Sequence, residues 1–167
     1  MAETQRFAGY MSVLRRRPDA RAVIAGSVEY RNIHGMVRFY QTRRGVLIAV
    51  EVMGLPQRES PCNDSFFGFH IHSGESCSGN ETDPFADALT HYNPQDCPHP
   101  AHAGDLPPLL GNRGYAFQIV FTDRFSVQEI VGKSIIIHDS ADDFVSQPGG
   151  NAGAKIACGE IRRLSFR

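Results

Sequence analysis

Short β-like segments recur along most of this 167-residue chain, whereas helical periodicity is nearly absent. Each segment is rich in Val, Ile, Phe or Tyr, and loops with Gly, Pro, Asn and Asp separate them. The segments are residues 22–30, 35–41, 46–53, 66–72, 115–121, 134–138 and 155–161. Arg43-Arg44-Gly45 between two of them predicts a hairpin turn. Seven or eight strands in one domain predict an all-β antiparallel sandwich or flattened barrel.

Three short helical segments are expected beside the strands. One lies near the N-terminus, where four apolar residues fall on one helical face: Phe7, Tyr10, Met11 and Leu14. Asp83 before Pro84 predicts a helical turn, and a capping box from Ser126 to Glu129 predicts another. Residues 73–114 form a long connection without strand signal, and a loop of this length in a compact domain is usually functional.

Composition excludes several classes of protein. A hydrophobic content of 41% and a charged content of 21% are ordinary for a soluble domain, and a net charge of −1 predicts neither nucleic-acid nor membrane-surface binding. No apolar run approaches the roughly 20 residues that span a bilayer. Residues 1–17 lack the apolar core of a secretory signal, so we expect a cytoplasmic protein, or one whose leader has been removed.

Six of the seven histidines gather in four short motifs, and only His34 lies outside them. The six are His70, His72, His91, His99, His102 and His138. A lone His-x-His pair is more often solvated or hydrogen-bonded than metal-binding. Six histidines and Asp105 in compatible order favour a metal site instead.

The first predicted group contains four imidazoles. His70 and His72 lie two apart in a strand, so their rings point to one face about 6.5–7 Å apart along the backbone. His138 ends another strand, and His91 comes from the long loop. Four imidazoles in a tetragonal arrangement favour Cu(II) among the common metals.

The second predicted group contains three imidazoles and one carboxylate: His91, His99, His102 and Asp105. Such a set, without a thiolate, suits a tetrahedral zinc site. His91 belongs to both groups. Because an imidazolate can use both ring nitrogens, one deprotonated ring at this position could bridge two metals.

Together these motifs resemble the copper–zinc superoxide dismutase family over about residues 21–161. The matching landmarks are Gly68-Phe69-His70-Ile71-His72, His91-Tyr92-Asn93-Pro94, His102-Ala103-Gly104-Asp105-Leu106, His138 through Asp142-Asp143, and Gly150-Asn151-Ala152-Gly153 running into Ala157-Cys158-Gly159. The resemblance implies an antiparallel Greek-key β-sandwich or flattened barrel of about eight strands with long metal-binding loops. We expect an N-terminal extension at residues 1–20, the superoxide dismutase-like domain at 21–163 and a short tail at 164–167.

The resemblance also implies the cofactors, the substrate and the site residues. Copper would bind His70, His72, His91 and His138, and zinc would bind His91, His99, His102 and Asp105. Asp142 would hydrogen-bond one ligand of each metal, and Cys77 would form a disulfide with Cys158. Superoxide would be the substrate, and the family allows a homodimer.

The implied reaction has two steps. One superoxide reduces Cu(II) and leaves as dioxygen, and a second reoxidises Cu(I) and leaves as hydrogen peroxide. His91 would release copper in the reduced state and deliver a proton to the departing peroxide. Lys155 would be the cation that attracts the anion.

This lysine departs from the pattern, because the family has an arginine three residues before the disulfide cysteine. The chain contains only two lysines among its seventeen basic residues, so a general preference for lysine does not explain the change. An ammonium lacks the planar fork of a guanidinium. We therefore expect an enzyme slowed by up to about tenfold, or roughly 1.4 kcal/mol of barrier. Between His138 and Cys158 the only cation is Lys155, whereas the same stretch has three acids: Asp139, Asp142 and Asp143. This charge balance predicts weak electrostatic steering of superoxide towards the site.

Cys62 and Cys97 have no counterpart in the family pattern. A second disulfide between them is the preferred interpretation. The alternatives are two inert thiols, or Cys97 acting at the zinc site. Two other functions also stay open: a non-catalytic copper- and zinc-binding protein on the same fold, and a binding module that uses the N-terminal segment with Arg15-Arg16-Arg17.

Overall fold

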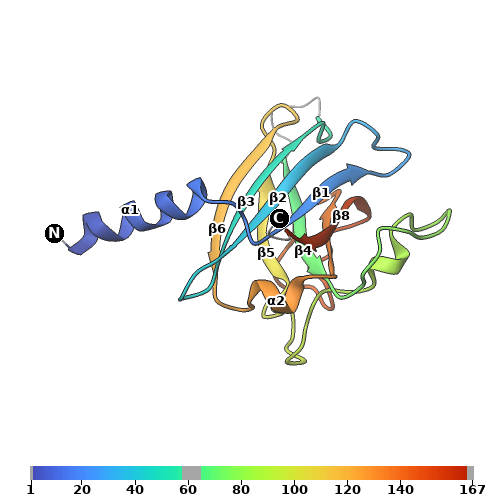
Figure 1. The fold of residues 1–167 in the computed structure, drawn as a ribbon. Helices are drawn as coiled ribbons and strands as arrows, with labels where there is room; N and C mark the ends of the chain where they lie inside the picture. Colours follow the sequence, from blue (N-terminus) through green and yellow to red (C-terminus); the bar gives the residue numbers. More distant parts are fainter. Residues whose placement is uncertain (1, 58–64, 165–167) are drawn as a thin grey trace.

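The computed structural model describes residues 2–57 and 65–164 of the chain. One antiparallel sheet of eight strands curls into a nearly closed barrel (Figure 1). The strands are β1 (Ala20–Gly26), β2 (His34–Gln41), β3 (Val46–Met53), β4 (Phe66–His72), β5 (Asp105–Leu110), β6 (Ala116–Thr122), β7 (Ser134–His138) and β8 (Lys155–Arg163). Their order is β5-β4-β7-β8-β1-β2-β3-β6. The predicted all-β antiparallel fold is confirmed.

The barrel interior holds the main apolar core, and strand alternation decides which side chains reach it. In β4, Phe69 and Ile71 face this core, so His70 and His72 lie on the outer face of the same strand. In β7, Ile137 faces the core and His138 lies outside. The outer face is nevertheless buried, because loops cover it. The strands thus place histidines between the barrel wall and its covering loops.

One of these covering loops joins β4 to β5. It contains a short 3-10 helix, η1 (Ala86–Ala88). Phe85 and Ala88 pack on the outward side chain of Ile136 in β7, next to Cys158 of β8. This small cluster fixes the loop against the barrel.

The helices confirm two of the predicted segments. Helix α1 (Ala2–Arg15) extends from the barrel in Figure 1, and its Val13 and Leu14 pack on an outer-face cluster of Tyr40, Leu47 and Ala49. Helix α2 (Val127–Ile130) starts at the predicted capping box, where the Glu129 carboxylate accepts both the N–H and the hydroxyl of Ser126. Arg16 donates to Asp19 at 3.0 Å, so the arginine run is partly used within the fold.

The prediction that residues 73–114 contain no strand is wrong. Strand β5 lies inside this stretch and pairs with β4. Its two prolines, Pro107 and Pro108, remove backbone donors and hide the strand signal. The prolines are tolerated because β5 lies at an end of the sheet order and pairs with another strand along one edge only. Within the described part of the chain, the backbone groups on its other edge form no hydrogen bonds to a neighbouring strand.

Two element boundaries also differ from those predicted. Strand β1 ends at Gly26, not at Tyr30, because the following residues form a turn in which Tyr30 donates to the Ser27 carbonyl. The helical turn expected at Asp83 begins later, at Ala86, and Asp83 instead accepts the Phe85 N–H before it. No helix in the described part of the chain is long and apolar enough to cross a membrane.

Candidate metal centre

The first cluster of side chains that could hold a metal ion lies over the outer face of β4 and β7. We call it the four-histidine group, and it contains His70, His72, His91 and His138, each offering a nitrogen within 4.8 Å of the others. The ring of His72 donates from Nδ1 to the Leu89 carbonyl at 2.8 Å. That of His138 donates from Nδ1 to the Gly153 carbonyl at 3.1 Å. Their Nε2 atoms therefore remain as lone-pair donors, and they lie 3.4 Å apart.

The second cluster gathers around Asp105, at the start of β5. We call it the histidine–aspartate group, and it contains His91, His99, His102 and Asp105. Oδ1 of the carboxylate lies 2.7 Å from His91 Nδ1 and 3.2 Å from His102 Nδ1. Oδ2 lies 3.0 Å from His99 Nδ1. Three imidazoles thus direct the same ring nitrogen towards one carboxylate.

His91 is the one residue that the two groups share. Its backbone forms a β-bridge with His72, and the next N–H, of Tyr92, donates to the Ile71 carbonyl at 2.8 Å. The ring centroid of His91 lies 4.0 Å from that of His70 and 5.5 Å from that of His102. One imidazole therefore reaches both groups.

Asp142 ties the two groups together from the other side. Its Oδ2 accepts from His70 Nε2 at 2.7 Å, and its Oδ1 accepts from His99 Nε2 at 2.9 Å. Gly150, at φ +69°, lets the backbone approach this carboxylate, because a Cβ there would lie 2.1 Å from Asp142 Oδ1. The carboxylate orients one ring of each group.

Two buried nitrogens test whether these residues fit metals. Among the described residues, His70 Nδ1 and His99 Nδ1 have no hydrogen-bond partner, although the latter lies close to Asp105. Leaving a buried polar atom unpaired costs about 1–3 kcal/mol, so such an atom calls for a partner. One of them belongs to each group. Four imidazoles suit Cu(II), and three imidazoles with a carboxylate suit zinc, so the residues fit both metals.

Burial sets the charge of the four-histidine group. It lowers the pKa of His70, and the hydrogen bond to Asp142 offsets this only in part. Burial, with neighbouring His138 and His91, holds the pKa of His72 well below its usual value. Burial also lowers the pKa of His138 to about 3. These rings are therefore neutral at pH 7, the state that binds a metal without first losing a proton.

The carboxylates of the site are held in the opposite state. Burial raises the pKa of Asp142, but the hydrogen bonds from His70, the Phe144 N–H and His99 outweigh it and leave that pKa well below its ordinary value. Burial likewise raises the pKa of Asp105, and His91 and the other histidines reverse the shift. Both carboxylates are therefore anionic at neutral pH, the state in which a carboxylate could bind a metal or accept hydrogen bonds from histidine rings.

Both groups border a cavity of about 980 Å³. Its walls include His72, His91, His102 and His138. Among the described residues that line it, Lys155 is the only lysine or arginine. Lys155 lies opposite His138 in the β7–β8 ladder. Its Nζ donates to Asp83 Oδ2 at 2.7 Å and to the Phe85 carbonyl at 3.1 Å.

Arg124 is a site residue that the sequence does not reveal. Its Nη1 donates to three carbonyls of the loop that carries the histidine–aspartate group: those of Pro100 and His102 at 3.2 Å and that of Asp105 at 3.4 Å. No motif marks this arginine, because its partners are backbone atoms brought near by the approach of β6 to β5. Arg124 fixes the path of the loop.

Gln147 makes a second unpredicted contact with this loop. Its Oε1 accepts the His99 N–H at 3.0 Å, and its Nε2 donates to the His99 carbonyl at 2.7 Å. The side-chain amide of Gln147 thus bonds both backbone groups of His99, as the backbone of a neighbouring strand does in a β-sheet. A glutamine in a loop carries no signal for such a role.

A disulfide joins Cys77 to Cys158, 81 residues apart, with an S–S distance of 2.05 Å. It attaches the loop that leads to His91 to strand β8. Cys97 forms no disulfide with another described residue and belongs to neither metal-binding group. Its predicted partner, Cys62, lies outside the described residues, so the second disulfide stays a prediction. Counting thiols under denaturing, non-reducing conditions separates two free thiols from none.

Comparison with known proteins identifies a family that this chain resembles. Residues 33–161 match the family described as copper/zinc superoxide dismutase (SODC). A copper–zinc superoxide dismutase of Aquifex aeolicus is 31% identical over 77% of this chain and 78% of its own length. One of Xenopus laevis is 33% identical over 83% and 93% respectively. The solved structure of a Cu/Zn superoxide dismutase from Brucella abortus shares the fold, with a TM-score of 0.69, 24% identity, and coverage of 84% and 98%.

Proposed function

This chain belongs to the copper/zinc superoxide dismutase family, and we propose that it disproportionates superoxide to dioxygen and hydrogen peroxide at a copper–zinc centre bridged by His91. The observation that carries the proposal is the sharing of one imidazole between two complete donor sets, with Asp142 linking the same sets. A protein that bound only one metal would have no need of this shared ring.

The roles of the ligands follow from which nitrogen each ring leaves available. Copper would be held by Nδ1 of His70 and Nε2 of His72 and His138, since their other nitrogens are hydrogen-bonded. Zinc would be held by Nδ1 of the remaining rings together with Asp105. Bound copper would supply one-electron oxidation and reduction, which no side chain of the chain supplies.

His91 is the residue placed to move a proton. Its Nδ1 faces Asp105, which leaves Nε2 towards Gly149, a residue of the cavity wall. We assign Nε2 the task of taking up a proton and delivering it to the departing peroxide. The contacts on the Nδ1 side keep the ring in place while that proton is exchanged.

Superoxide decay measured with protein loaded with both metals, each quantified per chain, tests the function. Fast decay at one copper per chain is expected. His138→Ala should abolish it, and His34→Ala, at an exposed histidine outside both groups, should leave it unchanged. Full copper occupancy with negligible decay would contradict the proposal and assign the chain to copper and zinc buffering or delivery.

Lys155 sets the expected speed. An ammonium attracts a small anion but lacks paired planar donors, so Lys155→Arg should raise the rate by up to about tenfold, or roughly 1.4 kcal/mol of barrier. The measurement is kcat/KM for superoxide at fixed copper content. An unchanged rate would show that the planar fork contributes nothing here.

A further inference from the structure

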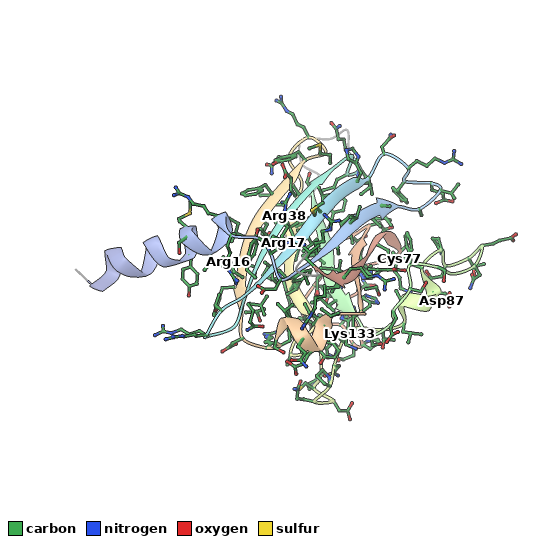
Figure 2. The ribbon with its side chains drawn as sticks, in the orientation of Figure 1. Arg16, Arg17, Arg38, Cys77, Asp87 and Lys133 are labelled. Atoms are coloured by element: carbon green, nitrogen blue, oxygen red, sulfur yellow. A yellow bond between two sulfur atoms is a disulfide. The ribbon has the colours of Figure 1, made fainter. Side chains whose placement is uncertain are left out.

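An acidic residue in the β4–β5 loop pairs with Lys155, the lysine in the wall of the cavity. The loop between Cys77 and His91 carries Asp83, whose Oδ2 accepts from Lys155 Nζ at 2.7 Å (Figure 2, where Cys77 and Asp87 mark this loop). The Lys155 side chain is only 15% exposed, whereas that of Asp83 is 39% exposed. The lysine side chain is therefore mostly buried in the cavity wall, and its carboxylate partner is the more exposed of the two.

The two carboxylate oxygens of Asp83 have separate partners. Oδ1 accepts the Phe85 N–H at 3.0 Å and shapes the turn before η1, while Oδ2 faces Lys155. Burial raises the pKa of Asp83, but the hydrogen bonds from Lys155 and the Phe85 N–H outweigh it, so the pKa lies below its ordinary value. The residue is a full anion at neutral pH. Asp83→Asn keeps the turn-forming oxygen and removes the charge.

We propose that Asp83 restrains Lys155 and cancels its charge at the cavity, so that this pair sets the affinity of the site for small anions, superoxide among them. Asp83 is a positioning residue, acting through Lys155. A paired ammonium and carboxylate present a dipole to an approaching anion, whose field falls off faster than that of a single charge. The consequence for superoxide rests on the proposed function; the consequence for other anions does not.

Azide, a small monoanion, is the probe of this pair. Copper(II)- and zinc-loaded protein is titrated with azide while the copper absorption band is followed. Asp83→Asn should bind azide about fivefold more tightly, because Lys155 then leaves one net positive charge in the cavity wall. The gain should shrink with added salt, since charges are screened over about 8 Å at physiological ionic strength.

Two further variants show whether the effect passes through Lys155. In a Lys155→Gln background, Asp83→Asn should give a smaller gain in azide affinity, because the acid's own charge is still removed but no ammonium is released. Asp87→Asn is the matched control: Asp87 is an exposed acid of the same loop, bonded to Ser78, and its loss should leave azide affinity unchanged. An unchanged affinity in Asp83→Asn, or an equal gain with and without Lys155, overturns the proposal.

The restraint itself can be measured without metals or activity. The chain has two lysines, so protein carrying [ε-13C]lysine gives two signals, assigned with Lys133→Arg. Lys133 lies 4.6 Å from the ring centroid of Tyr92 and serves as the internal reference. The Lys155 methylene should be rigid in the wild type and in Asp87→Asn, and mobile in Asp83→Asn. Equal mobility in all three contradicts the restraint.

The outcomes for this pair and for the enzyme are distinguishable. If azide binding and lysine mobility change as expected while superoxide decay is negligible, the proposed function fails and the role of Asp83 stands. If decay is fast but Asp83→Asn alters neither azide affinity nor mobility, the function stands and the role of Asp83 fails.

Discussion

The four-histidine group and the histidine–aspartate group are positioned by different means. Three of the four histidines in the first group lie on β4 and β7, where ladder bonds between neighbouring strands fix the backbone. In the second group, His99 and His102 lie in irregular chain, held by side chains such as Gln147 and Arg124. The sheet fixes the geometry of one group, while the other depends on separate clamps around a loop.

This difference predicts where each group is vulnerable. The rings on paired strands are preorganised. The main destabilising effect on the first group is therefore electrostatic, because several imidazoles are buried together and protonating them is unfavourable. The second group lies in loop structure that must be ordered at a conformational cost. Removing one clamp should therefore affect the second group more than the first.

Acid tests the electrostatic side of the comparison and should produce the largest effect. The pKa values of His70, His72 and His138 are lowered in the fold, so below about pH 6.5 the unfolded chain binds protons that the folded chain does not. The stability of the metal-free protein should therefore fall as the pH drops below about 6.5, and His138 alone should contribute about 1.4 kcal/mol per pH unit until the pH approaches its lowered pKa of about 3. Urea unfolding between pH 7.5 and 4.5 measures this slope.

A variant assigns the slope to particular rings. His138→Gln removes one titrating group, so the slope of stability against pH should decrease by about 1.4 kcal/mol per unit. Asp142 also contributes to the loss of stability at the lowest pH values. Its pKa is lowered in the fold, so its carboxylate is protonated more easily in the unfolded chain. A slope that is the same in His138→Gln would show that this ring is not buried neutral.

The disulfide tests how far the loop depends on its anchor. Replacing both Cys77 and Cys158 with Ser opens a connection of 81 residues, which should lower stability by about 4.5 kcal/mol in the chain-entropy model. The metal-free protein is compared with its variant by urea unfolding. Zinc should also be lost to a chelator faster, because the anchored loop leads to His91. A loss below about 1 kcal/mol would mean that packing alone holds the loop.

Arg124 offers the smallest and most selective test. Arg124→Gln removes donors to three loop carbonyls, and the loss of a residue that supports metal ligands should weaken zinc binding about tenfold. Copper affinity should stay within a factor of about two, since the paired strands carry most of the residues proposed to bind it. Competition with a calibrated chelator measures both metals. Arg44→Gln, in the exposed β2–β3 turn, is the control; equal losses for both metals would remove the distinction between the groups.

The sequence predicted the parts of the molecule that follow from local patterns. Segments rich in Val, Ile, Phe or Tyr predicted the strands that carry His70, His72 and His138, and the capping box predicted α2. The resemblance to a known family is confirmed by the match of residues 33–161, and the antiparallel barrel is confirmed by the strand order. The family resemblance and the strand prediction both depend on residue type and spacing, which can be read from the sequence alone.

What the sequence did not predict are contacts that depend on tertiary geometry. Strand β5 was missed because two prolines obscure its pattern, and only its place at the end of the sheet order makes them acceptable. Asp83 could not be linked to Lys155, 72 residues away, because no local rule connects them. The histidine rings of the first group also bond backbone carbonyls, such as those of Leu89 and Gly153. Residue type does not reveal such partners, because every residue has a carbonyl.

The most direct test of the two-metal account is anomalous X-ray scattering from crystals of the copper- and zinc-loaded protein, collected at the absorption edge of each element. We predict one copper peak between Nδ1 of His70 and Nε2 of His72 and His138, and one zinc peak beside Asp105, with the His91 ring between the two. A single peak, or the same metal in both places from a sample that contains one copper and one zinc per chain, would contradict the account.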